Sequence, residues 1–285
     1  MAYYFIHPEK DTTIYSHPDR DKMNSGHDEI LELVKEKSTT GEIYYTSRIL
    51  IQFKDSEIED IIKNKSGNNY TASLQLFSTE HKNLASNHKI EVHSLAQSWD
   101  EGTGRYSNLP TSSNGCSWTY TDDSLIKTPW TTSSFDVDKT GNGALVDGGG
   151  HWYKDYTGSQ TFSNASNLDT NIDVTTLVNQ ISASIFASAL TVNNGFIVKK
   201  PETVESDPTS SFGELKYFSV DTHTIYPPRL AFKWDDSTYS GHSSATIKNS
   251  GELNVSLYRN KEKYNQNDEA TFRIHVRDKY PDRTF

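Results

Sequence analysis

Cysteine is nearly absent from this chain, because Cys116 is the only one among 285 residues. A single cysteine excludes an intrachain disulfide, so the chain is not typical of the small secreted domains that depend on disulfides. Cys and His clusters with the short spacings of a zinc site are also missing. The fold must therefore rest on a hydrophobic core, and a chain of this length can bury one.

Long apolar runs and basic residues are also scarce. No segment approaches the roughly 18 consecutive apolar residues that indicate a membrane-spanning helix, and residues 1–8 lack the basic start and apolar core of a signal peptide. We therefore expect synthesis and folding in a cytosol, without membrane insertion. Acidic residues number 38 against 28 Lys and Arg, a formal net charge of −10. This balance argues against a nucleic-acid partner, because phosphates attract basic surfaces.

Aromatic and small polar residues are abundant instead. Aromatics make up 12% of the chain, with 16 tyrosines, and Tyr, Phe and Thr favour half-buried strands. Alternation of apolar and polar residues predicts strands at residues 12–15, 29–34, 43–53, 70–77, 89–95, 196–199, 214–220 and 229–234. Apolar residues at helical spacing predict helices at residues 55–65 and 173–189. We expect an all-β fold whose two short helices lie across a sheet or close the end of a sandwich.

Composition divides the chain into two parts. The sequence becomes polar after residues 234–237, so we assign residues 1–236 to a first domain. Residues 237–285 then form a C-terminal β extension or partial immunoglobulin-like domain, with strands at 252–258 and 270–276. So small a β unit has edge strands that need covering. Two interpretations stay open: this domain is truncated, or it completes its fold against a partner.

Residues 99–165 form a long region with little periodicity. Four of the five tryptophans lie in it: Trp99, Trp118, Trp130 and Trp152. An irregular region of this length is uncommon in a compact domain, so we expect a self-packed excursion with the tryptophans as its local core. The alternative is that these four side chains stack on sugar rings, which requires two of them to be exposed and coplanar on one face.

The start of this region looks like an enzyme loop. Asp100 and Glu101 are adjacent carboxylates, and paired carboxylates are what glycoside hydrolysis requires. Neighbouring residues on a strand point to opposite faces, so two neighbours rarely flank one bond. We favour a structural interpretation, in which Trp99 packs and the acids accept hydrogen bonds from turn amides or pair with Arg105. No catalytic residue is predicted.

Other candidate residues also have structural interpretations. Arg48 lies among strong strand residues, so we predict a structural ion pair or a clamp on a backbone carbonyl. Cys116 is expected to be buried. Gly-Gly-Gly at residues 148–150 lacks the Lys-Ser/Thr of a phosphate loop, and is predicted to be a turn that lets backbones approach closely.

The ten histidines do not suggest a metal centre. His88 and His93 lie five positions apart on an expected strand, which places them on opposite faces. His81 and His88 are too far apart for a helical ligand pair. No cofactor is expected, although a structural calcium ion held by Asp side chains and carbonyls stays open, with residues 11–29 as its candidate region.

An ordered set of segments resembles a known family. The segments are residues 11–16 (DTTIYS), 24–33 (NSGHDEILEL), 47–53 (SRILIQF), 72–76 (ASLQL), 92–95 (VHSL), 98–102 (SWDEG) and 227–230 (PPRL). Together they resemble the DNRLRE family of β-sandwich modules, relatives of carbohydrate-binding modules. The form of the motif found in this chain looks most like that of virion structural proteins of marine contractile-tailed bacteriophages. The segments that carry this likeness are Gly102-Thr103-Gly104, Ser117-Trp118, residues 221–228 and the terminal residues 280–285.

The resemblance covers roughly residues 5–235 and, more weakly, 245–285. It implies a jelly-roll-like sandwich that is a structural part of a virion, and it brings no catalytic residue set. We therefore expect a non-enzymatic component of a tail, neck, baseplate or fibre, made in the host cytoplasm. Its partners would be other virion proteins, in multiple copies related by symmetry. The alternatives are a module that binds host-surface glycans through the four tryptophans, and a glycan-cleaving enzyme that uses Asp100 and Glu101.

Overall fold

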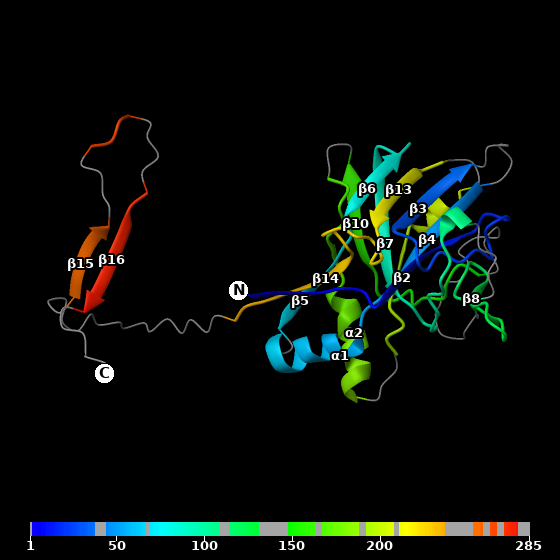
Figure 1. Ribbon diagram of the computed structural model, residues 1–285, viewed down its shortest axis with the longest axis horizontal. Coiled ribbons are helices and arrows are strands. Elements are labelled where there is room, and N and C mark those ends of the chain that lie inside the picture. Colours follow the sequence, from blue (N-terminus) through cyan, green and yellow to red (C-terminus); the bar gives the residue numbers. More distant parts are fainter. Residues whose placement is uncertain are drawn as a thin grey trace. The chain divides into compact units, whose positions relative to one another are not determined.

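The computed structural model describes residues 2–37, 44–66, 69–108, 114–130, 148–163, 167–187, 192–207, 211–236, 253–258, 263–266 and 271–278 (Figure 1). Its contacts divide the chain into two compact units, Met1–Ser237 and Thr238–Phe285. Strands dominate and helices are few, which confirms the predicted all-β class. None of the helices in this described part has the length and apolar character of a membrane-spanning segment.

The larger unit contains two antiparallel sheets that face each other as a sandwich. The smaller sheet has the strand order β1 (Ala2–Ile6), β14 (Arg229–Trp234), β5 (Tyr70–Gln75) and β11 (Ile172–Asp173). The larger has the order β10 (Gly158–Ser163), β7 (Asn87–Ser94), β12 (Phe196–Lys199), β4 (Tyr44–Gln52), β3 (Ile30–Lys37), β13 (Gly213–Phe218) and β6 (Ser78–Lys82), with β2 (Lys10–Tyr15) also paired to β4.

Strand β4 joins the parts of the larger sheet. Its first residues pair with β3, its last with β12, and most of its length with β2. Ile49 and Ile51 belong to the main core between the sheets, whereas Leu50 belongs to a second core. Since successive strand residues point to opposite faces, the sheet is buried on both sides at β4.

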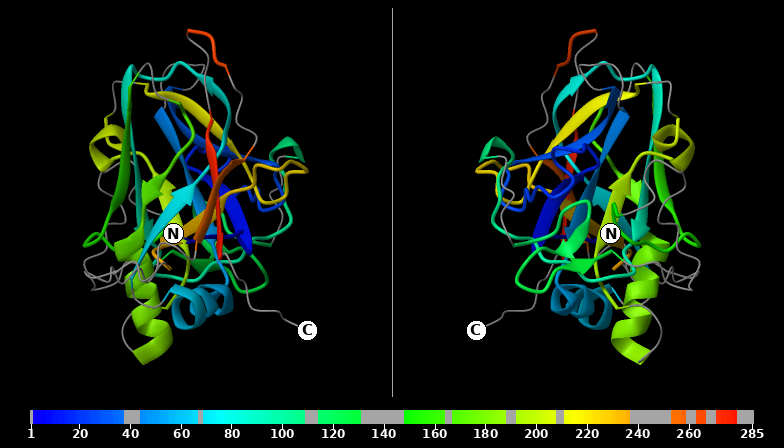
Figure 2. Two further views of the ribbon diagram at one scale, coloured as in Figure 1. Left: turned by 90° about the vertical axis from the view of Figure 1, so that its left-hand side faces the viewer. Right: turned by 90° about the vertical axis from the view of Figure 1, so that its right-hand side faces the viewer.

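Helices close one end of the sandwich. The first begins as α1 (Asp55–Asp60) and continues as a π-helical turn over Ile61–Ser66, and the second is α2 (Thr175–Ala187). Both pack side by side (Figures 1 and 2), and the main core receives their apolar residues: Ile58, Ile61, Ile62, Leu177, Val178 and Ile181. The two predicted helices and their place at a sandwich end are therefore confirmed.

Several short elements were not predicted. Strand β6 is mostly exposed and polar, β10 has a single fully buried aromatic residue, and α3 (Glu202–Glu205) is only four residues long. The prediction that residues 99–165 are irregular is wrong in part, since β10 pairs with β7 along its whole length. Two further short strands, β8 (Tyr120–Asp122) and β9 (Thr128–Pro129), pair with each other inside that region.

The smaller unit contains a two-stranded antiparallel sheet in its described residues. Strands β15 (Leu253–Tyr258) and β16 (Arg273–Asp278) pair with Val255 opposite Val276 and Leu257 opposite Ile274. Strands were predicted at both places. The terminal motif at residues 280–285 lies outside the described residues.

Candidate functional site

The four candidate tryptophans lie on the outer face of the larger sheet, inside a second core. Trp99, Trp118, Trp130 and Trp152 are 4%, 4%, 5% and 2% exposed. They cluster with Ile14, Leu50, Leu95, Cys116 and Ile197. The indole of Trp99 donates to the carbonyl of Asn194 at 2.9 Å, and that of Trp130 to the carbonyl of Ser117 at 2.9 Å.

This arrangement is a packed core. A sugar ring needs an accessible aromatic face, and burial leaves none of these four rings with one. The geometry therefore gives no support to a glycan site at Trp99, Trp118, Trp130 and Trp152. Cys116 is fully buried in the same core, as predicted, and burial raises the pKa of its thiol, so it is not a reactive cysteine.

Arg48 sits between two of these tryptophans. Its guanidinium carbon lies 4.7 Å from the ring centroid of Trp118 and 4.7 Å from that of Trp152. Nη2 and Nε bind the two carboxylate oxygens of Glu205 at 2.7 and 3.3 Å, and Nη1 donates to the carbonyl of Gly149. The predicted ion pair and the predicted carbonyl clamp are therefore both present, on a side chain that is 1% exposed.

The three consecutive glycines make this clamp possible. Gly148, Gly149 and Gly150 have φ of 98°, 80° and 96°, the left-handed region that only glycine adopts without strain. A Cβ at Gly149 would lie 2.5 Å from Nη1 of Arg48 and 2.5 Å from a ring atom of Trp118. The prediction of a turn that permits close approach is confirmed.

Glu205 is the centre of a charged group that the sequence did not reveal. Besides Arg48, Lys199 places its ammonium 3.4 Å from the same carboxylate, and Lys35 donates to the backbone carbonyl of Glu205 at 2.8 Å. Burial lowers the pKa of Lys199 and Lys35, and Glu205 partly offsets that effect. The one signal in the sequence was the pair Lys199-Lys200 at the end of a fully apolar strand, which demands a buried counter-charge.

Asp100 and Glu101 do not form an acid pair for hydrolysis. Asp100 is exposed, whereas Glu101 is partly buried and accepts a hydrogen bond from the amide of Asp11 at 3.0 Å. Burial raises the pKa of Glu101 to about 7, and nearby Asp221 adds to the shift. Of the two predicted alternatives, hydrogen bonds from turn amides or a pair with Arg105, the structure shows a hydrogen bond from a backbone amide, which belongs to strand β2 and not to a turn. Arg105 lies 3.8 Å from the carboxylate of Glu29.

Asn24 joins the segments of the family-like motif. Its amide nitrogen donates to the carbonyls of Glu101 and Cys116 at 2.7 and 2.8 Å, and its oxygen accepts from the amide of Gly104 at 2.8 Å. A Cβ at Gly26 would lie 2.0 Å from the carbonyl oxygen of Glu101. The motif residues at 24–26 and 101–104 thus meet for structural reasons.

The histidines in the described part of the chain do not form a metal centre. His88 stacks on Phe162 in the main core, with centroids 4.8 Å apart, while His93 lies beside Trp152 on the other side of β7. The prediction of opposite faces is confirmed. No group of three or more metal-ligating side chains occurs in the described ranges, and residues 11–29 contribute none. The fully buried Asp11 binds the amide of Val220 at 2.8 Å, and burial raises its pKa well above the ordinary value.

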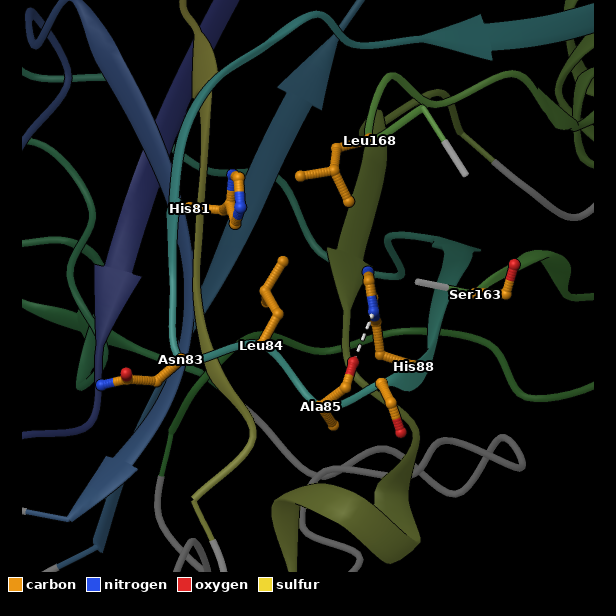
Figure 3. Close-up of a pocket in the computed structure, with 8 residues that line it drawn as sticks. His81, Asn83, Leu84, Ala85, His88, Ser163 and Leu168 are labelled. Carbon is orange, nitrogen blue, oxygen red and sulfur yellow. Dashed lines mark hydrogen bonds between the residues drawn. The ribbon is translucent and has the colours of Figure 1, made fainter. Parts of the chain in front are cut away.

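Two pockets adjoin His88. The larger, of about 410 Å³, is drawn in Figure 3 and is lined by His81, Asn83, Leu84, Ala85, Ser86, His88, Ser163 and Leu168. Nδ1 of His88 lies 3.4 Å from the carbonyl of Ala85. Because a carbonyl only accepts, that nitrogen carries the proton. Nε2 of His88 is buried without a partner, and both pockets lie where no site was predicted.

No protein-family model matches the chain, and no curated protein is significantly similar to it. The resemblance to DNRLRE modules accordingly stays a prediction from the motif order. What the structure supplies is the all-β sandwich and the structural roles of the motif residues.

Proposed function

We propose that this chain is a non-enzymatic structural protein of a bacteriophage virion, a component of the tail, neck, baseplate or fibre that acts through interfaces with other virion proteins. The ordered motifs support the virion assignment. The second unit supports the interface role, because it presents an apolar surface that its own described residues leave open.

That surface is one face of the β15–β16 sheet. Val255, Leu257, Ile274 and Val276 are 61%, 53%, 66% and 54% exposed. The strand register places Val255 opposite Val276 and Leu257 opposite Ile274, and residues two apart on a strand share a face. The other face carries polar side chains: Asn254, Ser256, His275 and Arg277.

A two-stranded sheet of this kind is marginally stable alone in water. Burying its apolar face against another sheet removes that surface from water, at about 25 cal/mol per Å² of apolar area. The occupant that fits is a second apolar sheet face, as in a β-sandwich. We assign it to a neighbouring virion protein.

The test compares two double variants in phage particles. Val255→Asp with Ile274→Asp places two carboxylates on the apolar face, and burying unpaired charge in an interface is strongly unfavourable. We expect incorporation into purified virions to fall at least about tenfold, which corresponds to 1.4 kcal/mol. Quantitative mass spectrometry of particles grown with each variant measures this.

The matched control changes the opposite face of the same sheet. Ser256→Asp with His275→Asp adds two carboxylates where the side chains are polar, and we expect normal incorporation. Equal incorporation of both double variants would contradict the interface role, and absence of the wild-type chain from purified virions would contradict the proposed function altogether.

A further inference from the structure

Four buried cations surround one buried carboxylate in the larger unit. Glu205 pairs with Arg48 at 2.7 Å and with Lys199 at 3.4 Å, and its backbone carbonyl binds Lys35. Lys200 is held near the same carboxylate, which interacts with it electrostatically. None of the five residues is more than 3% exposed. One carboxylate does not compensate four cations, and an uncompensated buried charge is strongly unfavourable.

The neighbouring carboxylates interact with other cations than Lys200. Glu91 lies 2.8 Å from the ammonium of Lys89 and 3.9 Å from His93, and it also interacts with Lys199. Asp207 interacts with Lys35. Lys200 has neither of them as a partner, and within the described part of the chain its ammonium makes no hydrogen bond or ion pair.

Lys200 is one of the residues that line the second pocket, which has a volume of about 310 Å³. The residues that line this pocket are Asn87, His88, Lys89, Thr161, Lys200, Val204 and Phe212. The volume lies at the lower end of the range for small-molecule sites. A buried lysine whose ammonium makes no hydrogen bond or ion pair with the described residues therefore lines a space large enough for a small ligand.

The lining selects a particular chemistry. It contains two lysines, an asparagine and a threonine, and none of these described lining residues is acidic. Val204 and Phe212 supply apolar surface. Burial lowers the pKa of Lys200 to about 8, so its side chain is still charged at neutral pH. One unpaired cation beside apolar walls suits a single negative charge on an apolar body.

We propose that this pocket binds a small organic monocarboxylate, with the carboxylate on the ammonium of Lys200 and the apolar body against Val204 and Phe212. An ion pair there compensates the fourth buried cation. Charge-assisted hydrogen bonds of this kind are about twice as strong as neutral ones. The site is independent of the proposed interface role, since it lies wholly within the larger unit.

Calorimetric titration with benzoate tests this site. Benzamide is the neutral probe of the same shape, and we expect it to bind at least about tenfold more weakly, because a hydrogen bond to a charged group contributes more than a neutral one. Lys200→Met keeps the length of the side chain and removes its charge. We expect this variant to weaken benzoate binding at least about tenfold. Lys63→Met, which removes an exposed lysine of the first helix, is expected to leave the affinity unchanged.

A second variant covers the case in which Lys200→Met fails to fold. Val204→Phe fills the pocket from a partly exposed position, and we expect it to abolish benzoate binding while the fold persists by circular dichroism. Three results would overturn the proposal: equal binding of benzoate and benzamide, tighter binding of inorganic phosphate than of benzoate, or no saturable benzoate binding to the wild-type protein.

Discussion

At the residue scale, Arg48 shows what a sequence can and cannot reveal. A charged residue between apolar strand residues must have a partner, so the need for an ion pair or carbonyl clamp was predictable. The partner was not, because Glu205 lies 157 positions away on a helix too short to give a periodic signal. For the hydrogen bond to Gly149, the sequence predicted only that a backbone approaches closely at the three consecutive glycines, and not that Arg48 is the partner.

Removing one member of this pair should be costly. Arg48→Met removes the two hydrogen bonds that the Glu205 carboxylate accepts from the guanidinium at 2.7 and 3.3 Å, and breaking a buried pair costs about 3–5 kcal/mol. Urea unfolding measures the loss. Arg105→Met is the control, because its pair with Glu29 is about half exposed and exposed pairs contribute at most about 1 kcal/mol. Similar losses in both variants would contradict a structural role for Arg48.

Glu101 should make stability depend on pH. Its pKa in the folded protein is about 7, raised from 4.5, so between these values the folded state keeps a proton that the unfolded state releases. The contribution of Glu101 to the free energy of unfolding is therefore most favourable below about pH 4.5 and falls as pH rises to about 7. In Glu101→Gln we expect a smaller fall, and a gain on the order of 1 kcal/mol at pH 8. The fall does not vanish, because buried Asp11 also has a raised pKa.

Thermal unfolding midpoints from pH 4.5 to 8 measure this effect. The control is Glu9→Gln, which removes an exposed carboxyl just before β2. It should leave the pH dependence of the unfolding midpoint as in the wild type. An unchanged slope in Glu101→Gln would show that this carboxyl does not carry the raised pKa.

At the scale of elements, strands with clear alternation were predictable and short or polar ones were not. Strands β12 and β14 match their predicted ranges, since their apolar residues are strongly patterned. Among the described strands, β6 pairs with β13 alone and exposes nearly all its side chains, so no alternation marks it. The Trp-rich segment was predicted as a local core. The position of this core on the outer face of the larger sheet could not be predicted, because it depends on contacts with residues distant in sequence, such as Leu50 and Ile197.

The structural role of this segment is testable with Trp118. Its ring packs against Arg48 and Gly149, so Trp118→Ala should destabilise the fold by about 3–5 kcal/mol. Urea unfolding is the measurement, and Trp234→Ala, at a partly exposed position, should cost less. If Trp118→Ala unfolded like the wild type but lost binding to host-envelope sugars, the segment would be a sugar site instead.

At the scale of the whole molecule, the two units differ in how complete they are. The larger unit buries both faces of its main sheet at β4 and pairs Arg48 with Glu205 in its interior. The described part of the smaller unit exposes the apolar face formed by Val255, Leu257, Ile274 and Val276. This contrast is the basis for the proposal that the smaller unit packs against a neighbouring protein.

An electron-microscopy map of the assembled virion tests this account most directly. We expect density for the chain in symmetry-related copies, with the apolar face of β15–β16 packed against a sheet of an adjacent protein. A particle without this chain, or one in which that face is open to solvent, would contradict it.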